Sequence, residues 1–231
     1  EPRLVVHYAA SVDSGFEGSY ELLKAYEDDN ADFHQVVAEM ADIPRSQAKT
    51  INLGMFYGMG KAKLAQQLGI EVEAAKAILE AYNVKVPFVK MLSNRCMTTA
   101  DKKGSVVTIK GRHCRFDRWE PKTFGIHKSM TREEAESKYE RGSIKRAMTY
   151  KALNRLIQGS AADQTKQAML DCYNNGHRPL LQIHDELCFN INGKEDEDNI
   201  KNQMEHCLDD VPMKVPSKVD IAIGDNWGEA T

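Results

Sequence analysis

Two adjacent acids, Asp185 and Glu186, follow His184 inside an otherwise apolar segment, LLQIHDELCFNI at residues 180–191. Side chains alternate along a strand, so a continuous strand would point Asp185 into an apolar face, which is costly without a compensating partner. A hairpin turn at His184–Asp185 would instead place the acids at the edge of a sheet. Adjacent carboxylates on a turn suit Mg²⁺, which prefers carboxylates, water and substrate phosphate. An ordinary polar hairpin tip is the structural alternative.

A second candidate site is the segment RSQAKTINLGMFYGMGK at residues 45–61. Arg45, Lys49 and Leu53 are four residues apart, so they share one side of a helix with 3.6 residues per turn. Tyr57 continues the same spiral and offers a flat surface for stacking. A helix N-terminus favours anions, so two cations at this end indicate an anionic ligand such as a polyphosphate. An exposed basic helix face explains the same pattern without a ligand.

A third candidate site is the segment LNRLIQGSAADQ at residues 153–164. Asn154 and Gln158 are four residues apart on one helical face, and Lys151 and Arg155 flank them. Amides can hydrogen-bond base edges, and the cations can hold phosphates. The small residues that follow Gln158 permit close approach of another backbone. Helix packing through small residues is the alternative.

Helices must position most of these residues. Hydrophobic periodicity and turn residues predict helices over 1–28 (with a second stretch near 18–27), 33–41, 45–57, 61–68, 71–82, 145–175 and 195–208. They predict strands at 105–109 and the following GRHCRF, a hairpin at 180–191 and a final strand at KVDIAIG, with a loop and a short acidic helix over 119–142. Helix with a small antiparallel sheet is the α+β class.

Composition is that of a soluble globular protein. The 231 residues are 42% hydrophobic and 28% charged, which suits one large domain or two interleaved ones. No apolar run approaches the roughly 20 residues of a membrane span, and the start does not resemble a signal peptide. The five cysteines are odd in number and form no C-x-x-C, which predicts reduced thiols rather than disulfides or a zinc site.

Charge is distributed unevenly along the chain. The net charge of −3 gives the whole molecule no attraction for nucleic acid. Residues 102–118 and 141–155 are nevertheless basic, and residues 194–210 are acidic. A local basic stripe can bind phosphates by counterion release, although a solvated charged surface is the simpler explanation.

Taken in order, RSQAKTINLGMFYG, LNRLIQGSAAD and QIHDEL resemble the family A DNA polymerases, the group of bacterial DNA polymerase I and phage replicases. EPRLVVHYA, ADFHQ, VVTIKGRHCRF and IAIGDNWGEA add weaker similarities, so the likeness extends from residue 1 to 231. The resemblance implies a right-hand polymerase fold. Its palm would comprise residues 1–17 and 149–231 and its fingers residues 18–148, with thumb and exonuclease domains outside this chain.

The resemblance also implies template-directed transfer of dNTPs to a primer 3′-hydroxyl, with two Mg²⁺ ions per active site. Asp185 would be the catalytic metal ligand and Glu186 its assisting neighbour. The implied nucleotide-binding residues are Arg45 and Lys49 with His34 at the triphosphate, Leu53 at the sugar, and Tyr57 hydrogen-bonded to Glu1 to exclude the ribose 2′-hydroxyl. The implied contacts to primer–template DNA are Asn154, Gln158, His184, Lys151, Arg155 and Arg112. Phosphoryl transfer depends on such metals and positioned cations.

The sequence departs from the family pattern at two positions. Leu53 stands where the family usually has Phe or Tyr, which predicts altered selection between deoxy- and dideoxynucleotides. Tyr150 stands where many members carry an Arg toward the minor groove, and Lys151 is expected to compensate in part.

A second catalytic Asp precedes, by five residues, the family's counterpart of Glu1. We therefore expect an upstream polymerase segment, in the same polypeptide or a separate chain, to supply this Asp and the thumb. Two ions about 3.5–4 Å apart need bridging ligands, so the 231 residues alone are expected to polymerise poorly. The intact Asp185 and Glu186 disfavour a non-catalytic DNA-binding subunit, and the Glu1–Tyr57 pair disfavours synthesis or copying of RNA. The expected location is the cytosol of a bacterium or of a phage-infected host.

Overall fold

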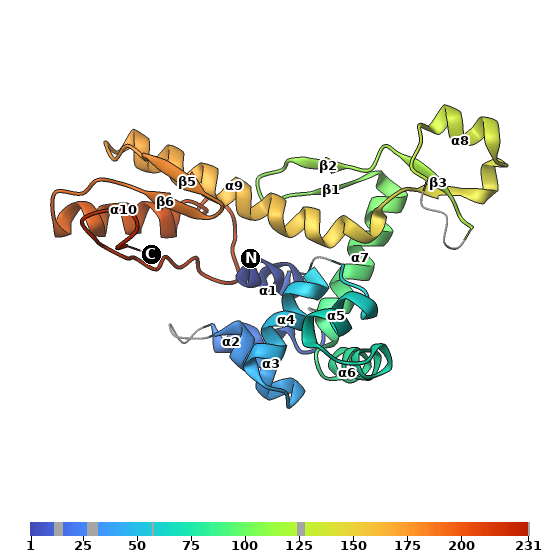
Figure 1. Ribbon diagram of the computed structural model, residues 1–231. Helices are drawn as coiled ribbons and strands as arrows, with labels where there is room; N and C mark the ends of the chain where they lie inside the picture. Colours follow the sequence, from blue (N-terminus) through green and yellow to red (C-terminus); the bar gives the residue numbers. More distant parts are fainter. Residues whose placement is uncertain (12–15, 27–31, 57, 124–127, 231) are drawn as a thin grey trace.

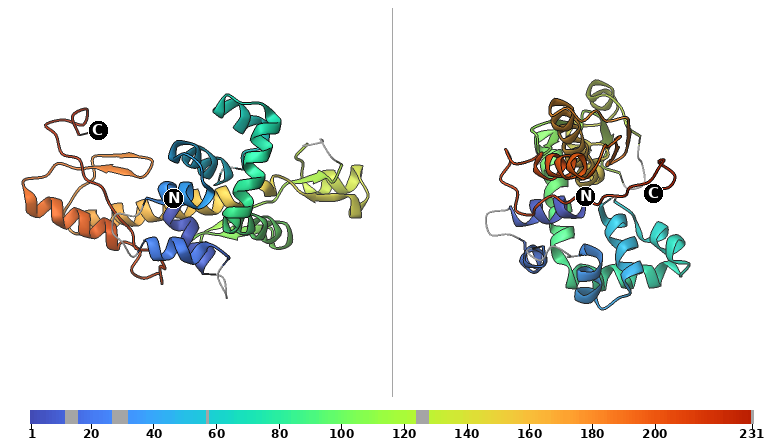
Figure 2. Two further views of the ribbon diagram at one scale, coloured as in Figure 1. Left: turned by 90° about the horizontal axis from the view of Figure 1, so that it is seen from below. Right: turned by 90° about the vertical axis from the view of Figure 1, so that its left-hand side faces the viewer.

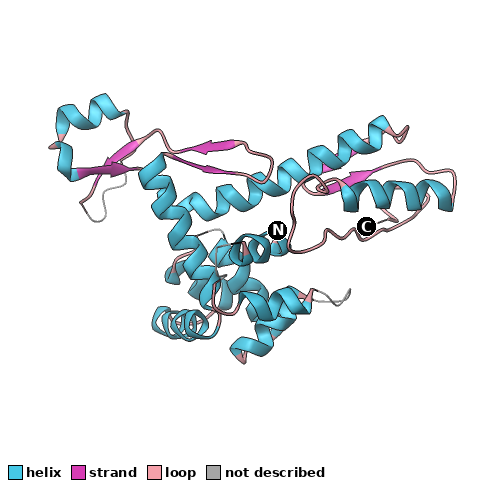
Figure 3. Cartoon of the chain, turned by 180° about the vertical axis from the view of Figure 1, so that it is seen from behind, coloured by secondary structure: helices cyan, strands magenta, loops and turns pink. Residues whose placement is uncertain are grey.

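The structure is a computed structural model that describes residues 1–11, 16–26, 32–56, 58–123 and 128–230, with backbone only at positions 40 and 41. Helices predominate in it (Figure 3). The helices are α1 (Pro2–Ala10), α2 (Ser19–Ala25), α3 (Phe33–Ala41), α4 (Arg45–Phe56), α5 (Lys61–Leu68), α6 (Val72–Lys85), α7 (Pro87–Lys103), α8 (Arg132–Lys138), α9 (Ala152–Asn174) and α10 (Lys194–His206). Short 3-10 turns cover Arg141–Ser143 and Thr149–Lys151.

The strands form three antiparallel pairs among the described residues. They are β1 (Ser105–Val107) with β2 (His113–Arg115), β3 (Trp119–Pro121) with β4 (Ile144–Arg146), and β5 (Leu181–Ile183) with β6 (Glu186–Cys188). The long helix α9 connects the parts of the molecule (Figure 1). The β5–β6 hairpin and α10 lie at one of its ends, β3 and α8 lie beyond the other, and the body formed by α1–α7 lies on one side (Figure 1).

One main core joins α1, α3, α4, α6, α7 and α9. Its side chains include Val5, Ile51, Tyr82, Phe88 and Leu153, each 2% exposed or less. The burial of such residues is the main favourable contribution to stability, at roughly 1.5–3 kcal/mol for each large apolar side chain. Helices α3 and α4 carry His34, Arg45 and Lys49. The main core fixes how these two helices pack against α6 and α9.

Local sequence explains where these helices begin and end. The Asp32 carboxylate caps α3 by accepting hydrogen bonds from the backbone nitrogens of His34 (2.8 Å) and Gln35 (3.3 Å). Helix α7 begins with Pro87, which lacks the N–H that a first helical turn leaves unpaired. It ends at Gly104, whose φ of 77° suits glycine.

The predicted α+β class, the helices near 33–41, 45–57, 61–68 and 71–82, and the hairpin at 180–191 are confirmed. The predicted final strand at KVDIAIG is wrong, because residues 218–224 form no strand and Ile221 and Ile223 are 41% and 60% exposed. A segment in which apolar and polar residues alternate forms a strand only where a neighbouring strand can hydrogen-bond to it.

The predicted single helix over 145–175 is also wrong at its start. Residues 144–146 pair with 119–121 as a strand, and Met148 adopts a left-handed φ of 58° before α9 begins at Ala152. Strand β3 lies in the region that was predicted as a loop with a short acidic helix. Helix α7 lies in a region for which no helix or strand was predicted.

Among the described residues, no helix combines the length and apolar character needed to cross a bilayer. All five cysteines are free, as their number and spacing predicted. Burial raises the pKa of the Cys96 thiol to about 12 and that of Cys172 to about 11. These thiols are therefore protonated and unreactive at neutral pH.

Candidate functional site

The acidic residues Asp185 and Glu186 lie at a tight hairpin turn, as predicted. Ile183 pairs with Glu186, so the turn consists of His184 and Asp185. His184 has a φ of 53°, the left-handed conformation that two-residue hairpin turns use. The side chains of His184, Asp185 and Glu186 are all exposed, so both carboxylates are open to solvent and ions.

Basic residues lie on the two helices α3 and α4. Arg45 binds the Asp32 carboxylate through Nε at 2.7 Å and Nη2 at 2.5 Å. Burial lowers the pKa of His34, and Arg45 and Lys49 lower it further against the opposing effect of Asp32. His34, Arg45 and Lys49 are therefore near enough for their charges to interact, and we call these three residues the cationic face.

Glu1 connects the cationic face with the acidic turn. The backbone nitrogen of Glu1 lies near enough to the Asp185 carboxylate and to the His34 ring for a charge at that atom to act on both. Glu1 therefore lies within electrostatic reach of Asp185 on one side and of His34 on the other. The start of α1 accordingly lies where the hairpin-bearing end meets the helical body (Figures 1 and 2).

The remaining predicted nucleotide-binding residues are less completely described. Leu53 is half-buried on α4 and packs against the main core. Tyr57 lies outside the described residues, and so does its expected hydrogen bond with Glu1. Asn52, the residue before Leu53, is fully buried and hydrogen-bonds to His34.

The predicted DNA-binding residues of α9 divide by what they contact. Gln158 is exposed, and Asn154 is half-buried one turn earlier on the same helix. Arg155 donates from Nη1 to the Arg115 carbonyl at 2.5 Å, with its guanidinium 4.5 Å from the ring centre of Phe116. Arg155 thus holds the segment around β2 against α9, whereas Gln158 points to solvent.

Arg112 also contacts α9. Its Nε donates to Oδ1 of Asp163 at 2.9 Å and its Nη2 donates to the Gly159 carbonyl at 2.8 Å. Asp163 accepts a further hydrogen bond from the Thr108 hydroxyl. These bonds fasten the β1–β2 hairpin to the helix that carries Asn154 and Gln158.

Several residues of this region were not predicted from the sequence. Asp32 had a recognisable signal, because it precedes the helical stretch 33–41 in the position of a helix cap. The sequence signal for Asn52 was weaker: it is a polar amide next to the apolar Ile51 within a predicted helix. Trp227, whose indole nitrogen donates to Oε1 of Glu186 at 2.9 Å, lies 41 residues from its partner and had no local signal.

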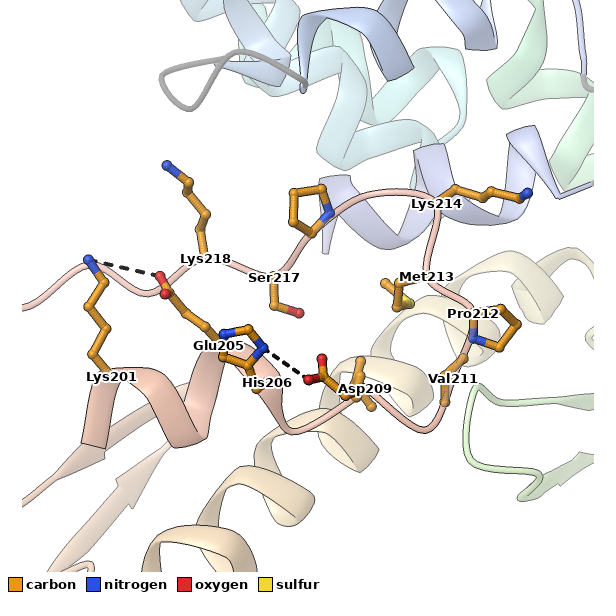
Figure 4. Close-up of a pocket in the computed structure, with 12 residues that line it drawn as sticks. Lys201, Glu205, His206, Asp209, Val211, Pro212, Met213, Lys214, Ser217 and Lys218 are labelled. Carbon is orange, nitrogen blue, oxygen red and sulfur yellow. Dashed lines mark hydrogen bonds and ion pairs between the residues drawn. The ribbon is translucent and has the colours of Figure 1, made fainter. Parts of the chain in front are cut away.

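A separate pocket of about 640 Å³ lies between the end of α10 and the chain that follows it (Figure 4). Two pairs lie in its lining, His206 with Asp209 at 3.0 Å and Lys201 with Glu205 at 4.0 Å, and Lys214 and Lys218 line it as well. None of the predicted site residues lines this pocket. It is therefore distinct from the region between the acidic turn and the cationic face.

Comparison with known proteins gives one consistent match. The model of the family described as DNA polymerase family A matches residues 14–229. A DNA-directed DNA polymerase of Pseudomonas phage M6 is 34% identical over 100% of this chain and 37% of its own length. The thermostable DNA polymerase I of Thermus aquaticus is 32% identical over 79% of this chain and 20% of its own.

Solved structures agree with the sequence matches. The POL domain of Pol1 from M. smegmatis, in complex with DNA primer-template and dNTP, has a TM-score of 0.72 and 27% sequence identity. The match covers 99% of this chain and 38% of that one. The chain therefore spans well under half the length of the proteins it matches.

Proposed function

Because the chain belongs to DNA polymerase family A, we propose that it carries out template-directed DNA synthesis as part of a DNA-directed DNA polymerase. In this reaction the primer 3′-oxygen bonds to the α-phosphorus of a dNTP. The bond from that phosphorus to the β-phosphate breaks, and pyrophosphate leaves. We assign residues 1–17 and 149–231 to the palm and residues 18–148 to the fingers.

One observation carries this proposal: Glu1 lies within electrostatic reach of both Asp185 and His34. Carboxylates and cations on two sides of one region suit a nucleotide whose triphosphate is bound by cations while metal ions act at its α-phosphate. A binding surface for DNA alone would gain nothing from exposed acids beside phosphate. The arrangement therefore favours a catalytic role.

The acidic turn fits Mg²⁺ by the chemistry of its donors. Asp185 and Glu186 are adjacent and exposed, and Mg²⁺ is commonly held by one or two carboxylates together with waters and substrate phosphates. Among the described residues, no cluster of three or more His, Cys, Asp or Glu forms a metal site. We assign Asp185 as the ligand of one ion, with Glu186 as its assisting neighbour.

A two-metal mechanism would need a further carboxylate to bridge the ions. We propose that an upstream polymerase segment supplies it, in the same polypeptide or in a separate chain. When bound, the metal ions would neutralise charge on the phosphates and lower the pKa of the primer hydroxyl. The chain's own residues would bind and orient the nucleotide and the DNA.

The cationic face would hold the triphosphate. Lys49 and Arg45 supply positive charge, and Arg45 would share its guanidinium between Asp32 and a phosphate oxygen. His34 would donate a hydrogen bond from its ring. Leu53 would contact the sugar, and Tyr57 with Glu1 would exclude a ribose 2′-hydroxyl.

Primer–template DNA would lie along α9 and the acidic turn. Asn154 and Gln158 would hydrogen-bond base edges in the minor groove, with Lys151 at the backbone and His184 near the primer end. Arg112 already binds the Gly159 carbonyl on α9, and Arg155, which belongs to α9, binds the Arg115 carbonyl on β2. We propose that they contact DNA while keeping this surface rigid.

Primer extension tests the proposal directly. A labelled primer–template is incubated with Mg²⁺, dNTPs and the 231-residue chain, with and without its natural upstream polypeptide. We expect extension to fall by on the order of a hundredfold or more in Asp185→Asn. Asp209→Asn, a matched change at an exposed acid of the separate pocket, should retain it. Equal extension by wild type and Asp185→Asn would contradict the assignment.

A further inference from the structure

The side chain of Asn52 links two helices inside the fingers. Asn52 is 0% exposed in the middle of α4. Its Nδ2 lies 3.1 Å from Nδ1 of His34 on α3, and its Oδ1 accepts a hydrogen bond from the Tyr82 hydroxyl on α6. A buried amide is destabilising when its polar atoms have no hydrogen-bond partners, so the three groups hold one another in place.

The direction of these bonds determines which nitrogen of His34 carries the proton. Tyr82 donates to Oδ1, which leaves Nδ2 of Asn52 facing the imidazole. An amide nitrogen can only donate, so Nδ1 of His34 must accept. A neutral imidazole that accepts at Nδ1 carries its proton on Nε2.

The charges around His34 favour its neutral form. Burial lowers the pKa of His34, the cations Arg45 and Lys49 lower it further, and Asp32 opposes them. At neutral pH His34 is therefore a neutral hydrogen-bond donor. Its Nε2 is the nitrogen left for a ligand, because Asn52 occupies Nδ1.

We propose that Asn52 and Tyr82 are positioning residues that keep the His34 proton on Nε2, so that this nitrogen donates to the triphosphate of the incoming nucleotide. The inference rests on the proposed function, because it requires a nucleotide at the cationic face. It adds a specific task for two residues that contact neither nucleotide nor metal. Tyr82 acts through Asn52, and Asn52 acts through His34.

Nitrogen-15 NMR of the 231-residue chain tests the tautomer. The His34 signals are assigned by their loss in His34→Gln, and two-bond proton–nitrogen correlations distinguish a protonated from an unprotonated ring nitrogen. In wild type we expect a protonated Nε2 and an unprotonated Nδ1. Tyr82→Phe frees the Asn52 amide to rotate, so both tautomers should become populated. Wild type with its proton on Nδ1, or no change in Tyr82→Phe, would overturn the proposal.

Two further variants sharpen the test. Asn52→Asp keeps an acceptor for Tyr82 but removes the donor to His34, so Nδ1 should become protonated; an unprotonated Nδ1 would overturn the proposal even if Tyr82→Phe failed to fold. Tyr8→Phe is the matched control, since the Tyr8 hydroxyl pairs with Oγ of Ser160 at 2.8 Å and has no link to His34. It should leave the His34 signals unchanged.

Nucleotide affinity separates this inference from the proposed function. With dATP and Mg²⁺ as the probe, we expect the Kd to rise about twofold in Tyr82→Phe, because the donor is then present about half of the time. A shifted tautomer with unchanged Kd would overturn the positioning role. If wild type binds no dATP, the proposed function fails at this surface, whereas the tautomer result still decides what Asn52 and Tyr82 do to His34.

Discussion

The indole nitrogen of Trp227 donates a 2.9 Å hydrogen bond to Oε1 of Glu186, although the two residues are 41 positions apart. The bond fastens the C-terminal segment to the acidic turn. Together with the Cys188 thiol, which donates to the same oxygen at 3.5 Å, it favours one orientation of an exposed carboxylate. Trp227 therefore restrains the Glu186 side chain next to Asp185 in the sequence.

We predict that Trp227→Phe weakens Mg²⁺ binding at the acidic turn. The Glu186 side chain would then lose rotational freedom only when the ion binds, and one such hydrogen bond contributes about 0.5–1.5 kcal/mol. The expected rise in Kd is roughly twofold to tenfold, measured by calorimetric titration with Mg²⁺. In a double-mutant cycle with Glu186→Gln the effect should vanish. Equal weakening in the presence and absence of the Glu186 carboxylate would show that Trp227 acts by packing alone.

The Asp32–Arg45 pair predicts a difference between two substitutions. Asp32→Asn removes the ion pair but still caps α3, and the partners are 37% and 50% exposed, so the free energy of unfolding should fall by less than about 1 kcal/mol. Asp32→Ala also removes the cap and should cost about 1 kcal/mol more. Urea denaturation measures both. Identical losses would mean that the carboxylate does not act as a cap.

We predict that acidic pH reduces the contribution of Asp32 to the stability of the folded state. Burial of its carboxylate raises the pKa, but hydrogen bonds from Arg45 and from the backbone of His34 and Gln35 outweigh this and lower it below its ordinary 3.8. The stabilisation is present above about pH 4 and is lost as the pH falls through the lowered pKa. The stability difference between wild type and Asp32→Asn should therefore shrink below pH 4, which denaturation at several pH values checks.

Features fixed by neighbouring residues could be predicted from the sequence, and features fixed by distant ones could not. The turn at His184–Asp185 and the spacing of Arg45 and Lys49 on α4 depend on a few adjacent positions. The Asp32–Arg45 and Glu186–Trp227 bonds depend on how whole helices and segments meet. Helix α7 is different, because its buried residues recur about every fourth position and the pattern would have predicted it.

Gly159 on α9 should resist replacement by alanine. A Cβ on Gly159 would lie 2.8 Å from Cγ2 of Thr108, which real contacts do not allow. Alanine normally stabilises a helix by up to about 1 kcal/mol, but here we expect a loss of about 1–3 kcal/mol, measured by urea denaturation. Thr108→Ser removes the clashing methyl and keeps the hydroxyl, so it should restore much of the loss. Gly142→Ala is the control, since its Cβ would meet no atom within 4 Å. A neutral Gly159→Ala would mean that β1–β2 and α9 can move apart freely.

Leu53 should tune sugar selection if the nucleotide lies over α4. An aromatic ring at this position would stack on the sugar, and a tyrosine would add a hydroxyl that can hydrogen-bond where a 3′-hydroxyl is absent. We expect Leu53→Phe to raise the rate of dNTP incorporation several-fold. Leu53→Tyr should in addition shift the dideoxy-to-deoxy ratio toward dideoxynucleotides. Competition between the two nucleotides in primer extension measures this, and an unchanged rate and ratio in both variants would remove Leu53 from the sugar contact.

The pKa of His34 depends on the charges of its neighbours in the cationic face. Burial, Arg45 and Lys49 lower the pKa of His34 below its ordinary 6.5, so the folded state binds fewer protons than the unfolded state and loses stability as the pH falls below about 6.5. Lys49→Gln removes one cation and should raise the pKa of His34, followed by NMR titration. Lys61→Gln, a change at a lysine that lies 4.0 Å from Glu73, should leave it unchanged. Binding of dATP with Mg²⁺ should raise the pKa as well, because phosphate charge stabilises the imidazolium. A pKa that responds to neither Lys49→Gln nor the nucleotide would place His34 outside the binding surface.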